Sequence, residues 1–194
     1  MRTGVAGVLL AAGAGTRLGR PKALVELAGQ SLTSRGVALL RDGGTAPIVV
    51  VTGAVSAEPL GALIVHNQHW RSGMGSSLAA GLTALPDSAT AAVIALVDQP
   101  LVGAEAIRRL IAAYHDGASV AVAGYGGEPR NPVLIARPYW SEVISSAVGD
   151  VGAREFLRAY PELITLVECG DTGCPDDVDT PEDLARITKA TQSP

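Results

Sequence analysis

Short apolar runs that end in turn residues alternate along this chain with amphipathic segments. Such runs are typical of strands that are buried on both faces. They predict strands at Val5–Ala11, Pro47–Thr52, Ala62–His66, Ala91–Val97, Ser119–Ala123 and Leu163–Glu168. Apolar residues at helical spacing predict helices at Leu32–Arg41, Ser76–Leu85, Ala104–His115, Tyr139–Ala147, Ala153–Tyr160 and Pro181–Lys189. Thr180 is expected to cap the last helix, with Pro181 at its first position.

Strands that alternate with helices predict a single α/β domain over residues 1–194. We expect a three-layer, Rossmann-like fold with a mostly parallel mixed sheet and helices on both faces. Ligands of such sheets bind outside the carboxyl ends of the strands. The stretch Gly124–Pro132 is rich in Gly and Pro, and it predicts a loop or a hairpin bend near that edge.

The composition narrows the class of protein. Hydrophobic residues make up 47% of the 194 residues and charged residues 18%, which favours a folded chain. A net charge of -4 argues against a dedicated nucleic-acid binder. Cys169 and Cys174 have no companions at zinc-ligand spacing. The first apolar run is too short for a signal peptide or a membrane span, so we expect a cytoplasmic protein with no membrane partner.

A glycine-rich loop follows the first predicted strand. Its small residues let the backbone approach a ligand closely, and consecutive N–H groups in such a loop form an anion site. Arg17, Arg20 and Lys22 add three cations to the same segment. A polyphosphate is the ligand that this combination favours. The loop residues concerned are Leu10, Ala11, Ala12, Gly13, Ala14, Gly15 and Thr16.

Two familiar phosphate loops do not fit this segment. The Walker A string G-x4-G-K-[ST] is absent. The glycine spacing is G-x-G-x-x-x-G instead of G-x-G-x-x-G, and the second strand ends at Thr52-Gly53 with no acid for a ribose. Pro21 also interrupts any helix that would start at the loop. A flexible connector without a ligand is the remaining structural alternative.

The loop closely resembles the signature of the MobA-like nucleotidyltransferases, L-A-A/G-G-x-x-x-R-x-G-x-x-K-x-L, and the match continues to Leu24. The resemblance extends from Val5 to Asp183 and is strongest to the branch of the molybdenum cofactor cytidylyltransferases. It implies that the loop backbone binds the base and triphosphate of an NTP. It also implies that Arg17 and Lys22 bind the phosphates and act in catalysis.

Two acidic positions are candidates for binding Mg²⁺, which prefers carboxylate, phosphate and water oxygens. Asp98 follows a buried strand directly, and Asp179 precedes the last helix. The alternatives are an ordinary turn acid for Asp98 and a solvated helix start for the acidic segment, which we prefer for Glu182 and Asp183. The family carries D-x-P and D-[IV]-D-T-P-E-D at these places, and the resemblance implies that Asp98 and Asp179 hold the metal.

The string W-x-x-G-M-G-S-S-L-x-x-G-L after the third strand resembles the cytidylyltransferase branch. Either Ser76 or Ser77 is also suited to cap the helix predicted there. The resemblance implies that Gly75 passes near the base and that Ser77 reaches it. It therefore favours CTP among the NTPs.

The acceptor half of the site is expected in two further segments. Residues 127–132 match G-x-P-x-x-P, and residues 149–154 match G-D-x-G-A-R of the same branch. The resemblance implies that Arg130, Asn131, Asp150 and Arg154 bind the acceptor, and arginine suits a phosphate. Family members often carry Gly-His where this chain has Arg130-Asn131. For Arg154, a surface position on a helix is the alternative.

Together these features predict transfer of an NMP, with CMP from CTP favoured, to a phosphate of a small acceptor such as molybdopterin, with release of pyrophosphate. The partner protein that this suggests is a molybdenum hydroxylase. Two other classes stay open. One is a non-catalytic maturation factor that keeps the nucleotide site. The other is an NAD(P)H-dependent oxidoreductase, because some relatives carry a nicotine-blue reductase label.

Overall fold

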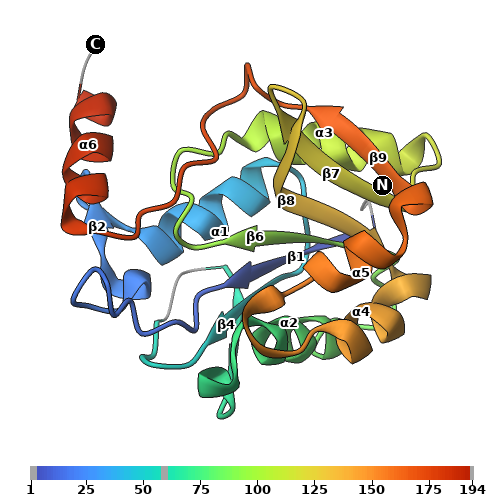
Figure 1. Ribbon diagram of the computed structural model, residues 1–194, viewed down its shortest axis with the longest axis horizontal. Helices are drawn as coiled ribbons and strands as arrows, with labels where there is room; N and C mark the ends of the chain where they lie inside the picture. The colour runs from blue at the N-terminus through green and yellow to red at the C-terminus, as the bar shows by residue number, and fades with distance from the viewer. Residues whose placement is uncertain (1–3, 58–60, 193–194) are drawn as a thin grey trace.

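A central sheet with helices on both faces forms the molecule (Figure 1). The computed structural model describes residues 4–57 and 61–192, and in these ranges seven strands follow the order β5-β4-β1-β6-β8-β7-β9. The strands are β1 (Val5–Leu10), β4 (Ile48–Thr52), β5 (Leu63–His66), β6 (Ala91–Leu96), β7 (Val120–Tyr125), β8 (Glu128–Ala136) and β9 (Ile164–Glu168). The helices are α1 (Leu32–Asp42), α2 (Met74–Thr83), α3 (Ala104–His115), α4 (Trp140–Ser146), α5 (Arg154–Ala159) and α6 (Pro181–Gln192). A short ribbon of β2 (Glu26–Leu27) and β3 (Gln30–Ser31) lies outside the sheet.

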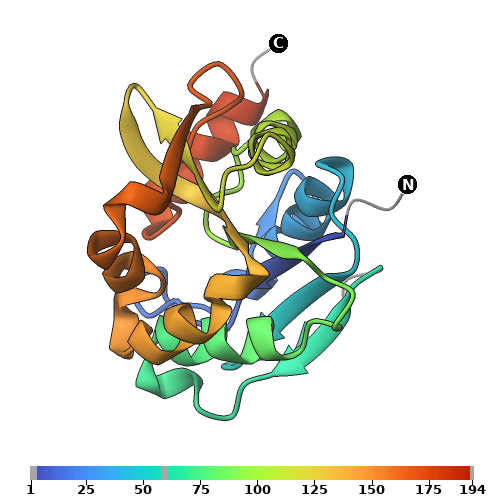
Figure 2. The ribbon, with the colours of Figure 1, turned by 90° about the vertical axis from the view of Figure 1, so that its right-hand side faces the viewer.

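Both faces of the sheet are buried because its central strands are apolar throughout. In β1, Val5 and Leu9 belong to the core under α1 and α3, and Val8 and Leu10 belong to the core under α2, α4 and α5. Figure 2 shows these two helical layers on opposite sides of the twisted sheet. Side chains that alternate between the faces of a strand explain why every residue of β1 is apolar or glycine. The predicted three-layer α/β fold is thereby confirmed.

The sheet is parallel except at β8, which pairs antiparallel with both β6 and β7. The stretch Gly124–Pro132 was predicted to be a loop or a hairpin bend, but its second half is the start of β8. Gly126 and Gly127 have φ of 62° and 82° and form the turn of the β7–β8 hairpin. The hairpin alternative was therefore right, but the strand after it was missed because Pro129 and Pro132 interrupt its apolar pattern.

Two helix starts show how local chemistry sets the boundaries. The second helix begins at Met74, directly after Gly73 at φ 111°, so Ser76 and Ser77 lie inside the helix and do not cap it. At α6 the prediction is confirmed, because the Thr180 hydroxyl accepts a hydrogen bond from the Asp183 N–H at 3.2 Å. The Asp183 carboxylate accepts one in return from the Thr180 N–H at 3.0 Å. These two bonds form a reciprocal capping box.

Candidate active site

A cleft with a volume of about 570 Å³ opens at the carboxyl edge of the sheet. This size is ordinary for a small-molecule site. Five segments meet there: the loop after β1, the start of α2, the end of β6, the start of α5 and the irregular segment before α6. The predicted site residues that line the cleft are Leu10, Ala12, Gly13, Ala14, Gly15, Thr16, Arg17, Lys22, Ser77, Asp98, Asp150, Arg154 and Asp179.

The glycine-rich loop presents free backbone donors to this cleft. Ala11 donates its N–H to Val51, and the Ala12 carbonyl accepts from Ala54, so the start of the loop is fixed to β4. The next four N–H groups, of residues 13–16, donate to no other described residue. Gly15 has φ 63°, and a Cβ there would overlap the Arg20 carbonyl oxygen, so only glycine fits. Consecutive free N–H groups of this kind are suited to bind an anion.

Lys22 connects the loop to both predicted metal ligands. Its Nζ donates to Asp98 Oδ2 at 2.7 Å and to Asp179 Oδ1 at 2.5 Å. Burial alone would lower the pKa of Lys22, but the charges and hydrogen bonds of the two carboxylates outweigh it, so the pKa lies above its ordinary value. Arg17 approaches the other oxygen of Asp179 at 3.0 Å, although its side chain is 74% exposed. Asp98 and Asp179, which are 81 positions apart by their numbers, thus share one ammonium group.

The remaining oxygen of Asp98 is suited to a metal. Asp98 Oδ1 is buried and accepts no hydrogen bond from any described residue. A buried carboxylate oxygen is costly without a partner, and a hard cation is one partner that satisfies it. In the described part of the chain, no three acidic, His or Cys side chains are arranged so that they could hold a metal ion together. This donor set suits Mg²⁺, which usually takes one or two carboxylates and completes its shell with water and phosphate.

The sequence reasoning missed a third carboxylate and an aromatic wall. Asp177 lines the cleft, and its Oδ1 accepts a hydrogen bond from Gln99 Nε2 at 2.9 Å. Partial desolvation and the nearby charge of Asp98 raise the pKa of Asp177. Trp70 also lines the cleft, with the Arg71 guanidinium 4.5 Å from its ring centroid. The D-x-D spacing was the available signal for Asp177, because alternate residues of an extended segment share a side.

The start of α2 positions Ser77 but keeps Gly75 out of the cleft lining. Ser77 is 3% exposed, and its hydroxyl accepts a hydrogen bond from Asn67 Nδ2 at 3.0 Å. Gly75 lies against the Ala147 carbonyl, where a Cβ would overlap it. Glycine at this position therefore allows close packing of the segment before α5 against α2.

The structure separates the four residues predicted to bind the acceptor. Asp150 and Arg154 line the cleft, and Asp150 Oδ1 also accepts a hydrogen bond from the Met74 N–H at 3.3 Å. That bond holds the wall formed by residues 149–151 against the start of α2. Arg130 and Asn131 lie on β8 and are not among the residues that line the cleft.

The comparison with known families now decides the class of the protein. Residues 7–163, well over half of the chain, match the MobA-like NTP transferase domain. The chain belongs to this family. By family it is therefore a nucleotidyltransferase. In the described residues, no helix is long and apolar enough to cross a membrane.

One curated protein and two solved structures illustrate what this chain is similar to. The chain is 39% identical to a protein of Paenarthrobacter nicotinovorans described as nicotine blue oxidoreductase, over 94% of this chain and 96% of that protein. A crystal structure of a mycobacterial homologue of Rv0371c, from strain JC1, is 28% identical and superposes with a TM-score of 0.83 over 98% of both chains. Rv0371c of Mycobacterium tuberculosis in complex with manganese is 23% identical, with a TM-score of 0.74 over 96% of this chain and 98% of that one. The last of these similarities concerns the fold alone.

Proposed function

We propose that this protein transfers CMP from CTP to a phosphate of a small acceptor, molybdopterin, and releases pyrophosphate. The observation that carries the proposal is the arrangement around Lys22. The free N–H groups of the loop, the Lys22 ammonium and the Asp98 carboxylate meet in one cleft of suitable size. Phosphoryl and nucleotidyl transfer depend mainly on positioning and on charge neutralisation, and this cleft offers both.

In the proposed reaction, an acceptor phosphate oxygen attacks the α-phosphorus of CTP, and the bond from that phosphorus to the pyrophosphate oxygen breaks. The loop N–H groups and Arg17 would bind the pyrophosphate part, and Lys22 would face the developing negative charge. A magnesium ion held by Asp98 and Asp179 would neutralise phosphate charge when bound. A protein with the same fold, Rv0371c of Mycobacterium tuberculosis, is known in complex with manganese, and this supports the proposal of a divalent cation.

Different residues of the cleft lining are assigned to different parts of the reactants. We assign the contact with the base to Ser77 and to the residues at the start of the loop, which line the cleft. Arg154 lines the cleft as well and offers a bidentate group for the acceptor phosphate. The cleft arrangement favours Arg154 over Arg130 for this role, because Arg130 is exposed on β8 outside the cleft.

Pyrophosphate release with molybdopterin and each of CTP, GTP, ATP and UTP tests the proposal. We expect CTP to be preferred and Asp98→Asn to lower turnover about a hundredfold or more, as for loss of one transition-state contact. Arg154→Met is expected to raise the KM for the acceptor, and Arg130→Met to leave it unchanged. Tight CTP binding without any pyrophosphate release would instead indicate a non-catalytic maturation factor for a molybdenum hydroxylase.

A second candidate function follows from the Paenarthrobacter relative, which is described as an oxidoreductase. Under this alternative the cleft would bind NAD(P)H, and the chain would reduce a pigment. The end of β4 speaks against an ordinary dinucleotide site, because a Cβ at Gly53 would lie 2.5 Å from Trp70 and no acid is present there. Oxidation of NADPH in the presence of nicotine blue, without consumption of any NTP, would establish this function and overturn the transferase proposal.

A further inference from the structure

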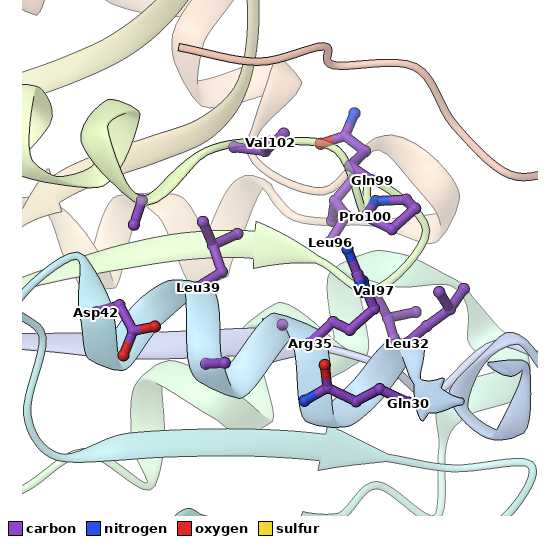
Figure 3. A pocket seen from close by; sticks show the side chains of 13 residues that line it. Gln30, Leu32, Arg35, Leu39, Asp42, Leu96, Val97, Gln99, Pro100 and Val102 are labelled. Carbon is purple, nitrogen blue, oxygen red and sulfur yellow. The ribbon is translucent and has the colours of Figure 1, made fainter. Parts of the chain in front are cut away.

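A second cavity, of about 240 Å³, lies between α1 and the segment that follows β6 (Figure 3). Leu96 and Val97 contribute to both this cavity and the active-site cleft. Asp98 lines only the cleft, whereas Gln99 and Pro100 line only this cavity. The segment that carries the predicted metal ligand therefore separates two spaces, and the second one has no part in the proposed reaction.

Arg35 gives this cavity a charge that the protein does not neutralise. Its side chain extends from α1 toward Val97 in Figure 3. No described residue pairs with the Arg35 guanidinium, and Nε is buried without a hydrogen-bond partner. Asp42 lines the same cavity, but Arg41 binds its Oδ1 at 3.1 Å. A buried guanidinium N–H that no protein group satisfies is costly, so an acceptor from outside the chain would stabilise the fold.

The remaining walls define what kind of acceptor fits. Leu32, Leu39, Val97 and Val102 supply apolar surface around Arg35. A fully hydrated dianion such as phosphate is poorly suited to such walls, and the carboxylate of Asp42 would repel a dianion more strongly than a monoanion. A monocarboxylate with a short hydrocarbon part is better suited, because its hydrocarbon part matches the apolar walls and its carboxylate matches the guanidinium fork. The volume is compatible, since a cavity of about 150 Å³ is known to hold benzene.

We propose that this cavity binds a small monocarboxylate, with the carboxylate on Arg35 and the hydrocarbon part against Leu39, Val97 and Val102. The ligand would contact the residues on both sides of Asp98, and it would thereby favour the arrangement of this segment seen in the structure. Gln99 also connects this segment to the segment before α6, because its Nε2 donates hydrogen bonds to the Pro175 carbonyl and to Asp177 Oδ1.

Isothermal titration of the full-length protein with butyrate and benzoate, against sodium chloride at the same ionic strength, tests the proposal. We expect saturable binding that Arg35→Met weakens about tenfold or more, the loss expected for a charge-assisted hydrogen bond. Arg158→Met removes an exposed arginine on α5, and Arg17→Met removes a cation of the cleft. Both controls should leave butyrate affinity unchanged.

Arg35→Lys keeps the charge without the fork, and it decides the question if Arg35→Met does not fold; we expect weakened binding. Absence of saturable binding to the wild type would overturn the proposal. Equal butyrate affinity in the wild type and the Arg35 variants would overturn it too. Binding of inorganic phosphate that depends on Arg35, without binding of either carboxylate, would overturn the assignment of the ligand class.

Discussion

Replacing Lys22 by Met removes the charge that Asp98 and Asp179 share and keeps most of the aliphatic stem. Removal of one partner from a fully buried ion pair costs about 3–5 kcal/mol, and exposed pairs contribute about 0–1 kcal/mol. The side chains here are 15%, 22% and 26% exposed for Lys22, Asp98 and Asp179, so water screens part of the effect. We therefore expect Lys22→Met to lower the free energy of unfolding by about 2 kcal/mol at neutral pH without divalent metal.

Urea unfolding with and without Mg²⁺ measures this effect. The lysine ammonium occupies the space between the two predicted metal ligands, so Mg²⁺ must compete with it in the wild type. In Lys22→Met the competitor is gone, and we expect Mg²⁺ to raise the stability of the variant by more than that of the wild type. Arg17→Met is the comparison, because Arg17 is 74% exposed and its loss should cost under about 1 kcal/mol.

Two results would refute this reasoning. If Lys22→Met were as stable as the wild type without metal, the ion pair would contribute no net stability. An equal response of both proteins to Mg²⁺ would show that the metal does not bind between Asp98 and Asp179. Loss of turnover alone would not decide whether the ion pair or the metal is responsible, because Lys22 is also proposed to contact phosphate.

Three further predictions concern packing, capping and pH. Gly75→Ala should destabilise the protein by about 1–3 kcal/mol in urea unfolding, because the new methyl group overlaps the Ala147 carbonyl. This is the reverse of the gain that Ala usually gives over Gly inside a helix. A gain in stability would contradict this packing. Thr180→Ala should cost about 1 kcal/mol through loss of the α6 cap, and an unchanged urea midpoint would contradict the role of that hydrogen bond. Because the folded pKa of Lys22 lies above the ordinary value of 10.5, its contribution is complete below that pH and is lost as the pH rises through the folded pKa. Burial raises the pKa of Tyr125 to about 12, so ionisation of this hydroxyl also favours unfolding only in strong alkali. The free energy of unfolding, measured from neutral pH upward, should therefore stay level to pH 9, and an earlier fall would show that other groups titrate.

The pattern of apolar runs was sufficient for the central strands because β1, β4 and β6 are buried on both faces. The same reasoning failed at β8, where the strand begins in a stretch with two prolines and becomes apolar only from Val133. Its antiparallel pairing with β6 depends on contacts between distant segments, which no local pattern encodes. Tertiary pairing, and not local propensity, decides such a strand.

The candidate site shows a similar division. The string of the loop predicted Lys22, and the strand end predicted Asp98, because both features lie within one short segment of sequence. Nothing local indicated that Lys22 joins Asp98 to Asp179, or that Asp150 binds the start of α2. The motif match also grouped Arg130 with the acceptor residues, although β8 carries it away from the cleft lining. Motif matching identifies residue types in order, whereas the fold decides which of them meet.

The charges that meet in the cleft constrain how a nucleotide can bind. Asp98, Asp177 and Asp179 line it together, and Lys22 is already hydrogen-bonded to two of them. A triphosphate that arrived without a divalent cation would bring further negative charge beside three carboxylates. Coulomb repulsion between neighbouring anions is large in a partly desolvated site. A divalent cation held by Asp98 and Asp179 would reverse the balance, because it would neutralise both carboxylates and leave the Lys22 ammonium to turn to the phosphates. We therefore expect nucleotide and metal binding to be coupled through Lys22, whose ammonium lies between the two carboxylates in the free protein and would leave them when both ligands bind.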